Sequence, residues 1–216
     1  MRQISHIIFD WDGTLMDSAE KIITCMQAAA IASKLPIPKA EDVKSIIGIS
    51  LIPAIKMLFE VDSKTAEIVR AHYKQIFVTE DQTPCFMFPD AKEVLECLSA
   101  TYTLGIATGK ARRGLKRALN QSQCEHLFNA SITADDAESK PSSDMLVKLL
   151  AHWQIKPENA VMIGDTKYDM QMAENIGMHR IGVSFGAHSR SQLLDHNPLH
   201  IIDDLTRLPE IFDANI

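Results

Sequence analysis

The sequence predicts an α/β fold: a parallel sheet with helices on both faces, and a small all-helical subdomain inserted after the first strand. Short, nearly uninterrupted apolar runs alternate with helical patterns of about ten residues, which is typical of parallel strands buried on both faces. This alternation stops after the first run, and residues 18–77 carry helical patterns alone. With 216 residues, 46% of them apolar, and only 9 Gly and 9 Pro, the chain has a globular composition.

Six apolar runs are expected to form the sheet, and in such sheets ligands bind beyond the carboxyl ends of the strands. The strands are expected at Ile4–Phe9, Thr103–Ala107, Ala130–Thr133, Ala160–Ile163, Arg180–Val183 and, at an edge, His200–Ile202. Helices are expected between them at Asp90–Ser99, Ala111–Asn120, Ser143–Trp153 and Lys167–Ile176. Ser142, Ser143 or Asp144 is expected to cap the third of these helices.

The inserted segment is expected to form a helical subdomain. Its helices are expected at Ser18–Lys34, Ala40–Ile46, Ser50–Glu60 and Ser63–Phe77. Ser50 and Ser63 stand where N-capping residues are common, and the apolar residues of the first helix share one face. We therefore expect a Rossmann-like core made of residues 1–16 and 85–216, and a helical subdomain made of residues 17–84.

Charge and cysteine content narrow the class of protein further. Lys plus Arg total 22 and Asp plus Glu total 28, so the net charge is −6, which argues against a nucleic-acid partner but not against a small anionic substrate. The four cysteines have neither zinc-site spacing nor the density of a disulfide scaffold. No apolar run is long enough for a signal sequence or a membrane span. We therefore expect a soluble cytoplasmic protein without a membrane partner.

The segment Asp10-Trp11-Asp12-Gly13-Thr14 directly follows the first strand. Two carboxylates two positions apart at a strand end can face the same point, because side chains alternate there with a period of two. Gly13 permits a tight turn that brings the backbone close to an anion. One carboxylate could then attack phosphorus while the other moves a proton. The alternative is an ordinary Asp-Gly turn at an acidic strand end.

A second acidic pair, Asp165 and Asp169, follows the strand that ends at Ile163. Together, Asp10 and Asp165 would offer Mg²⁺ two hard anionic oxygens, and this ion keeps several of its waters. The alternative is that Asp165 caps the following helix and Asp169 is solvated.

Two further sites suit a phosphate group. Thr108-Gly109 follows a third strand and offers a hydroxyl and an amide as donors for a phosphate oxygen. Lys140-Pro141 adds a cation beside a residue that stiffens the chain, although a lone Lys-Pro pair is usually a surface turn. Taken together, the four sites indicate magnesium, phosphate and a nucleophilic carboxylate.

Four segments, DWDGTLMDS, ATGK, SKP and IGDTKYDM, resemble in this order the four motifs of the haloacid dehalogenase superfamily. The resemblance covers the whole chain and is strongest to the phosphoglycolate-phosphatase-like branch, whose helical cap follows strand one. It implies a phosphoric monoester hydrolase with Mg²⁺ as cofactor. It also implies that Asp10 forms an aspartyl-phosphate and that Asp12 is the general acid/base, with its backbone carbonyl on the metal.

The same resemblance assigns the other site residues. Thr108, Gly109 and Gly13 would bind phosphate, and Lys140 would both bind it and neutralise the crowded charges as a catalytic residue. Asp165 would join Asp10 as a metal ligand. Asp169 would lie behind these ligands or be a weaker one.

Asp12 favours phosphate-ester hydrolysis, because dehalogenases of similar fold lack a carboxylate there. The substrate is expected to be a small phosphorylated metabolite, phosphoglycolate-like or a sugar phosphate. Thr-Gly-Lys replaces the Thr-Asn-Lys frequent in phosphoglycolate phosphatases, so that exact substrate stays open. The alternatives are a phosphomutase, a phosphonatase using cap lysine Lys44 or Lys56, and a binding protein without activity. The oligomeric state is left open.

Residues outside the four motifs are candidates for substrate selection. By the resemblance, Gly48, Ile49 and Ser50 lie in a cap loop that closes over the site, and Lys110 lies beside it. A basic cluster follows Thr108, made of Lys110, Arg112, Arg113, Lys116 and Arg117. It either attracts an anionic substrate or a nucleic acid, or is a solvated helix face. His188 is expected to be a surface residue.

Overall fold

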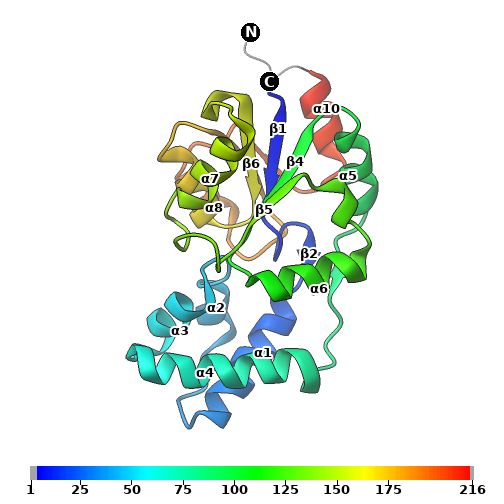
Figure 1. The fold of residues 1–216 in the computed structure, drawn as a ribbon. Coiled ribbons are helices and arrows are strands. Elements are labelled where there is room, and N and C mark those ends of the chain that lie inside the picture. Colours follow the sequence, from blue (N-terminus) through cyan, green and yellow to red (C-terminus); the bar gives the residue numbers. More distant parts are fainter. Residues whose placement is uncertain (1–3, 215–216) are drawn as a thin grey trace.

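The computed structural model describes residues 4–214 and has the predicted α/β architecture (Figure 1). Six parallel strands form one sheet in the order β5-β4-β1-β6-β7-β8. The strands are β1 His6–Phe9, β4 Thr103–Ala107, β5 Ala130–Ile132, β6 Ala160–Gly164, β7 His179–Val183 and β8 His200–Ile202. All six predicted strands are confirmed, with ends shifted by one or two residues. Residues 1–3 and 215–216, which the sequence assigns to the core, lie outside the described residues.

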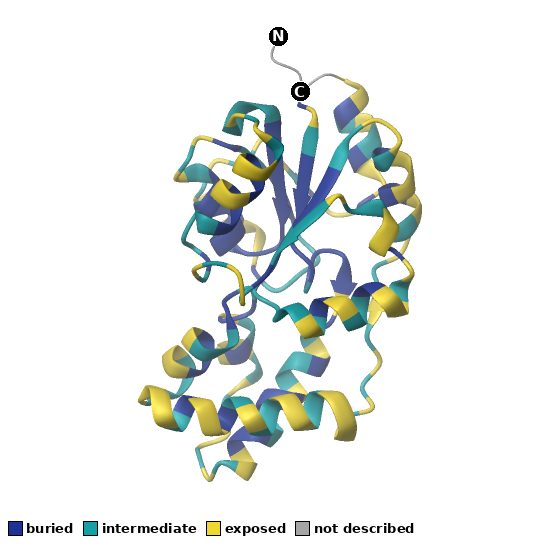
Figure 2. Ribbon diagram, viewed as in Figure 1, coloured by how far each residue is buried: buried dark blue, intermediate teal, exposed yellow. Residues whose placement is uncertain are grey.

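Side chains on the two faces of the sheet enter separate hydrophobic clusters, because successive residues of a strand point to opposite faces. Ile7 and Phe9 of β1 pack on one face with α5 (Ala91–Ser99), α6 (Arg112–Ser122) and α10 (Arg207–Asp213). Ile8 packs on the other face with α7 (Asp144–Trp153) and α8 (Lys167–Glu174). Figure 2 shows the central strands buried beneath helices whose outer faces are exposed. The short helices α9 (Arg190–Leu194) and α10 are not among the predicted elements.

The inserted segment is helical, as predicted, and has its own hydrophobic cluster. Its helices are α1 Ala19–Ala32, α2 Ala40–Lys44, α3 Leu51–Phe59 and α4 Ser63–Gln75, followed by a π-helix, Ile76–Glu80. Tyr168 of α8 joins this cluster, so one side chain of the sheet-bearing part packs among the inserted helices. Among the described residues, no helix combines the length and the apolar character needed to cross a bilayer.

The predicted cap Ser63 is wrong, and Ser50 and Ser143 stand at the N-cap without capping through their side chains. The carboxylate of Asp62, rather than Ser63, caps α4 by accepting a hydrogen bond from the Thr65 N–H. Ser50 stands at the N-cap of α3 but makes no side-chain capping bond. Ser143 holds the same position before α7, and its hydroxyl donates to the Met172 carbonyl instead. Asp144 is the first residue inside α7, and Ser142 precedes the N-cap.

The chain enters and leaves the helical segment through a two-stranded antiparallel pair that the sequence does not reveal. β2 (Met16–Asp17) pairs with β3 (Phe86–Met87). Close by, the Lys21 ammonium lies 3.0 Å from Asp81 Oδ1 and donates to the Asp81 carbonyl at 2.9 Å. In Figure 1 the inserted helices lie beyond the carboxyl ends of the central strands, where ligands of such sheets bind.

Candidate active site

The three central strands bring the predicted site residues together. Asp10 follows β1, Thr108 follows β4, and Asp165 follows β6; β1 lies between the other two strands. Carboxyl ends of neighbouring parallel strands meet at one edge of a sheet, so these residues share that edge. All three are buried, with at most 1% of each residue exposed.

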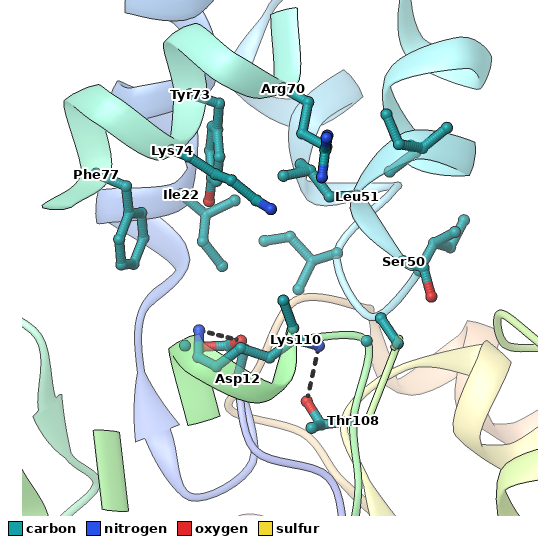
Figure 3. A pocket seen from close by; sticks show the side chains of 18 of the residues that line it. Asp12, Ile22, Ser50, Leu51, Arg70, Tyr73, Lys74, Phe77, Thr108 and Lys110 are labelled. Carbon is teal, nitrogen blue, oxygen red and sulfur yellow. Dashed lines mark hydrogen bonds and ion pairs between the residues drawn. The ribbon is translucent and has the colours of Figure 1, made fainter. Parts of the chain in front are cut away.

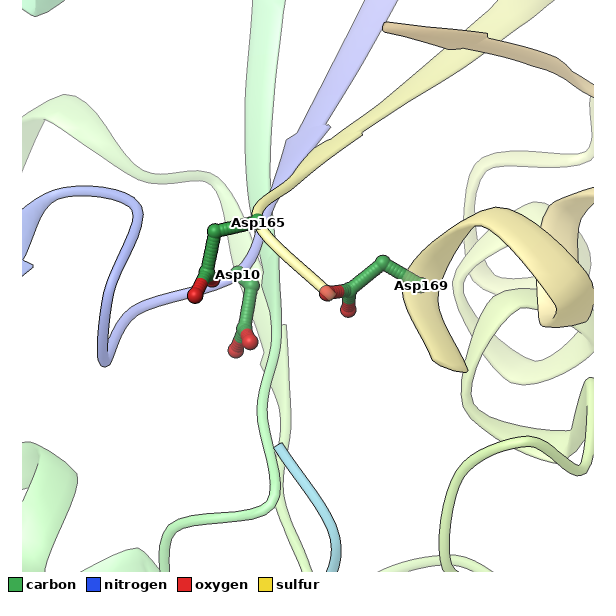
Figure 4. A group of neighbouring side chains, drawn as sticks. All are labelled: Asp10, Asp165 and Asp169. Atoms are coloured by element: carbon green, nitrogen blue, oxygen red, sulfur yellow. The ribbon is translucent and has the colours of Figure 1, made fainter. Parts of the chain in front are cut away.

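Asp10, Asp165 and Asp169 form a compact acidic group (Figure 4). One oxygen from each carboxylate lies within 4.8 Å of the others. Lys140, whose side chain is fully buried, places its ammonium 2.9 Å from Asp10 Oδ2 and 2.6 Å from Asp169 Oδ1. Three carboxylates and one ammonium leave a formal excess of two negative charges. That excess suits a divalent cation.

The three carboxylates differ in how many hydrogen bonds their oxygens already accept. Both oxygens of Asp169 are engaged, Oδ1 by Lys140 and Oδ2 by the Thr166 hydroxyl at 2.7 Å, in a capping box that starts α8. Asp165 accepts from the Thr14 hydroxyl at 2.8 Å and from the Ala187 N–H at 2.7 Å. These bonds fix the orientation of both carboxylates before any ligand binds.

Asp10 is the least satisfied member of the group. Its Oδ1 accepts a hydrogen bond of 2.7 Å from the Trp11 N–H. Its Oδ2 forms an ion pair with the Lys140 ammonium at 2.9 Å but accepts no hydrogen bond from the described residues. A buried carboxylate oxygen without a hydrogen bond is costly unless a ligand satisfies it. Asp10 Oδ2 is therefore available to a metal ion or an electrophile.

Burial and mutual repulsion disfavour the charged form of two of these carboxylates. Burial raises the pKa of Asp10 well above its ordinary value, and the Lys140 charge offsets this only in part. Burial and the neighbouring Asp169 carboxylate raise the pKa of Asp165 to about 7. For Lys140, burial lowers the pKa, but the Asp10 and Asp169 charges outweigh it and the net shift is upward.

Asp12 is held apart from this acidic group. Its carboxylate accepts from the Ser18 hydroxyl at 2.8 Å and pairs with the Lys110 ammonium at 2.7 Å (Figure 3). Phe77 of the π-helix lies over the same ammonium, 5.4 Å from ring centroid to nitrogen. Lys110, a candidate for substrate selection, thus contacts Asp12 directly.

The phosphate-binding candidates stand beside Asp10 and Asp12. Thr108 Oγ1 accepts a hydrogen bond of 3.2 Å from the Lys110 N–H, and its own hydroxyl proton is available to a ligand. Gly13 has φ of +85°, and a Cβ there would lie 2.2 Å from Asp165 Oδ2. A side chain at this position would both strain the backbone and displace a carboxylate.

The loop Gly48-Ile49-Ser50 lies directly against the strand-end residues. A Cβ on Gly109 would lie 2.5 Å from the Gly48 carbonyl oxygen, so only glycine permits this approach. The Ser50 N–H donates to the Ser139 hydroxyl at 2.9 Å. A cavity of about 680 Å³ lies between the inserted helices and the sheet edge, and its lining includes Asp10, Asp12 and all three loop residues.

Three residues near the strand-end site, none of them lining the cavity, are not identified by the sequence. Thr14 ends the segment Asp10-Trp11-Asp12-Gly13-Thr14, but nothing in the sequence indicates that its hydroxyl contacts Asp165. Tyr168 donates its hydroxyl to the Ser45 carbonyl at 2.9 Å and so ties α8 to the inserted helices. His188 is not a surface residue: it is 3% exposed, and its Nδ1 accepts from the Lys167 N–H at 3.1 Å. Its burial arises because the loop after β7 folds back over the start of α8.

Fold and site together place a buried group of carboxylates at the sheet edge, beneath the inserted helices. Residues 7–183 match the model of the haloacid dehalogenase-like hydrolase family. The chain belongs to this family.

Relatives of known name agree with this class. The chain is 30% identical to Pyrophosphatase PpaX of Bacillus cereus, over 99% of both chains. It is 29% identical to "Probable phosphatase IndB" of Dickeya dadantii, over 94% of this chain and 90% of that protein. The protein is therefore an enzyme of the phosphatase class, a phosphoric monoester hydrolase that takes a phosphorylated substrate.

Solved structures show the same fold over nearly the whole chain. A haloacid dehalogenase-like family hydrolase from Streptococcus pneumoniae superposes with a TM-score of 0.84 at 26% identity, covering 98% of this chain and 100% of that one. A protein titled a predicted phosphoglycolate phosphatase, from Haemophilus somnus, has a TM-score of 0.88 at 22% identity, covering 98% and 99%.

Proposed function

We propose that the protein is a Mg²⁺-dependent phosphatase of small phosphorylated metabolites and that Asp10 is its nucleophile. The observation that carries this proposal is Asp10 itself, a cavity-lining residue buried at the end of β1, whose Oδ2 pairs with Lys140 but accepts no hydrogen bond from the described residues. The division into a core of residues 1–16 and 85–216 and a cap of residues 17–84 is part of the same proposal.

The reaction has two balanced steps. An Asp10 carboxylate oxygen forms a bond to phosphorus, the bond from phosphorus to the ester oxygen breaks, and Asp12 in its acid form protonates the leaving alkoxide. Asp12, now a carboxylate, then takes a proton from water, which attacks the aspartyl-phosphate and releases inorganic phosphate and the Asp10 carboxylate. Lys110 and Ser18 orient Asp12 for both proton transfers.

Donors around the site would hold the transferred group. We assign the Thr108 hydroxyl, the amides of Gly109 and Gly13, and the Lys140 ammonium to the phosphoryl oxygens. Phosphoryl transfer depends mainly on positioning and on neutralising charge, and these groups supply both.

The residues present fit a hard divalent cation. The group has two excess negative charges, and Asp10 Oδ2 accepts no hydrogen bond from the described residues. All ligand atoms that the three carboxylates offer are oxygens, which Mg²⁺ prefers. Asp10, Asp165 and the Asp12 backbone carbonyl would hold it, with Asp169 behind them because its oxygens are already engaged. When bound, the ion would polarise the phosphoryl group and offset the charge of the carboxylates.

The substrate is selected by the cap in this proposal. Gly48, Ile49 and Ser50 line the cavity together with Lys110 and would contact the leaving group, which we place among phosphoglycolate-like compounds and sugar phosphates. Inorganic pyrophosphate is a second candidate, favoured by the full-length similarity to proteins named pyrophosphatase. For the phosphonatase alternative, neither Lys44 nor Lys56 is among the cavity-lining residues, which counts against it.

Steady-state hydrolysis of p-nitrophenyl phosphate tests the proposal, with Mg²⁺ added or removed by EDTA. We expect Asp10→Asn to lower kcat by several powers of ten. Asp203→Asn, an exposed aspartate far from the site in sequence, is the matched control and should retain full activity. Hydrolysis without Mg²⁺ that persists in Asp10→Asn would contradict the proposal.

The covalent step has its own readout. With p-nitrophenyl phosphate, whose leaving group needs no proton, Asp12→Asn should still form the aspartyl-phosphate but hydrolyse it slowly. Mass spectrometry of the quenched variant should then find phosphate on the peptide that contains Asp10. A panel of phosphoglycolate, sugar phosphates and pyrophosphate then ranks the substrates by kcat/KM. Isomerisation of a sugar phosphate faster than phosphate release would instead identify a phosphomutase.

A further inference from the structure

One wall of the cavity is basic, and the helix α4 supplies part of it. Arg70, Tyr73, Lys74 and Phe77 all line the cavity. Their spacing of three, four and seven positions places them on one face of the helical segment. In Figure 3 the side chains of Arg70 and Lys74 extend from this face toward the side of the cavity that carries Asp12 and Thr108.

The helix α6 of the sheet-bearing part supplies the other cations. Arg113 and Arg117, four positions apart and so on one helix face, line the same cavity. Leu115 and Leu119 of this helix are buried against the sheet. Two helices far apart in sequence thus present positive charge to one space.

Three of these cations are uncompensated. The side chains of Lys74, Arg113 and Arg117 form no ion pair or hydrogen bond with any residue from 4 to 214; the first two residues are exposed and Arg117 is half-buried. Their basic neighbours differ: Arg70 pairs with Glu67, Lys110 pairs with Asp12 at 2.7 Å, and Arg112 pairs with Asp136. In a chain of net charge −6, three free cations around one cavity are an anion-binding arrangement.

We propose that Lys74, Arg113 and Arg117 bind a second anionic group of the substrate, remote from the phosphoryl group that Asp10 attacks. This inference rests on the proposed function. The substrate class is then a small molecule with a phosphate ester at one end and a carboxylate or a second phosphoryl group at the other. Guanidinium groups suit both, because their paired N–H donors match the oxygens of either anion.

The size and the apolar lining of the cavity support the same substrate class. About 680 Å³ is in the range of pockets for whole small molecules, far more than one phosphoryl group fills. Ile22, Ile49 and Leu51 also line it and would contact the segment that joins the two anionic ends. Long-range attraction would favour an ester by its total charge, and every cation on the two helices would contribute to it, whereas a binding subsite depends on the cations that line the cavity.

Three synthetic esters that differ only at the far end test this inference. They are butyl phosphate, 4-(phosphonooxy)butanoate and butane-1,4-diyl bisphosphate, and the readout is the ratio of kcat/KM for each doubly anionic ester to that for butyl phosphate. Comparing the ratios for 4-(phosphonooxy)butanoate and butane-1,4-diyl bisphosphate shows whether the subsite prefers a carboxylate or a second phosphoryl group. The variants are Lys74→Gln and Arg117→Gln. Lys64→Gln on α4 and Lys116→Gln on α6 are the matched controls, since both lysines are exposed and neither lines the cavity.

We expect the wild type to prefer at least one doubly anionic ester. Each of the two variants should lower that ratio by about tenfold, mainly through KM, because each removes one charged contact. Both control variants should keep the wild-type ratio. Equal kcat/KM for all three esters, or an unchanged ratio in Lys74→Gln and Arg117→Gln, would refute the subsite and leave the proposed function intact. No hydrolysis of any ester in the presence of Mg²⁺ would overturn the proposed function, and this inference with it.

Discussion

Replacing Lys140 with methionine should strongly destabilise the metal-free protein. The Lys140 side chain is fully buried, and its ammonium is 2.9 Å from Asp10 and 2.6 Å from Asp169. Methionine keeps much of the volume but removes the one positive charge that this acidic group contacts among the described residues. Leaving buried charges uncompensated in this way costs about 3–5 kcal/mol of unfolding free energy.

Urea denaturation followed by circular dichroism in EDTA measures this cost. Lys148→Met is the matched control, because Lys148 forms an ion pair of similar length, 2.7 Å to Asp144, with its side chain 43% exposed. An exposed pair contributes at most about 1 kcal/mol, so the two variants should differ severalfold. Saturating Mg²⁺ should restore part of the loss in Lys140→Met and none in Lys148→Met.

The double variant Lys140→Met with Asp169→Asn keeps the reasoning testable if the single variant unfolds. It removes one carboxylate with the ammonium and should recover part of the lost stability, a coupling that a double-mutant cycle quantifies. Equal, small effects of Lys140→Met and Lys148→Met in EDTA would refute the view that burial of unbalanced charge sets the stability of this site.

Two further predictions follow from the hydrogen bonds and the burial. Thr14→Val removes the hydroxyl that orients Asp165 and should raise the Mg²⁺ concentration for half-maximal activity by about ten- to a hundredfold. Thr14→Ser keeps the hydroxyl and should not. Superimposable Mg²⁺ titrations of Thr14→Val and the wild type would contradict this prediction. Burial raises the pKa of the Cys25 thiol to about 12 and that of the Cys85 thiol to about 11. The exposed Cys97 should therefore react first with a thiol reagent at mildly alkaline pH. A fast phase of the reaction that persists in Cys97→Ser would contradict this prediction.

Local sequence patterns were sufficient to predict most of the strands and helices. The six strands and the helices of the inserted segment show up as apolar runs and helical periodicity, which depend on neighbours in the sequence. β2 and β3 do not, because two residues cannot display an alternation and their pairing joins distant parts of the chain. The capping of α4 by Asp62 rather than Ser63 also escapes, since adjacent residues compete for one N–H.

The candidate site was predictable where it depends on strand ends. Asp10, Thr108 and Asp165 follow recognisable strands, and parallel strands bring such residues to one edge. Lys140 is a different case, because a Lys-Pro pair in isolation indicates a surface turn. Its side chain is completely buried in the folded protein, where its ammonium pairs with Asp10 and Asp169.

The sequence by itself determined the kind of elements, the carboxylates at the strand ends and the family of the protein. The tertiary structure alone decided that His188 is buried, that Lys110 pairs with Asp12, and that Lys74 and Arg117 face one cavity. The physical reason is that a polar helix face has the same pattern whether it meets bulk water or a wet cavity. Burial and charge pairing depend on residues distant in the chain, and folding is what brings those residues together.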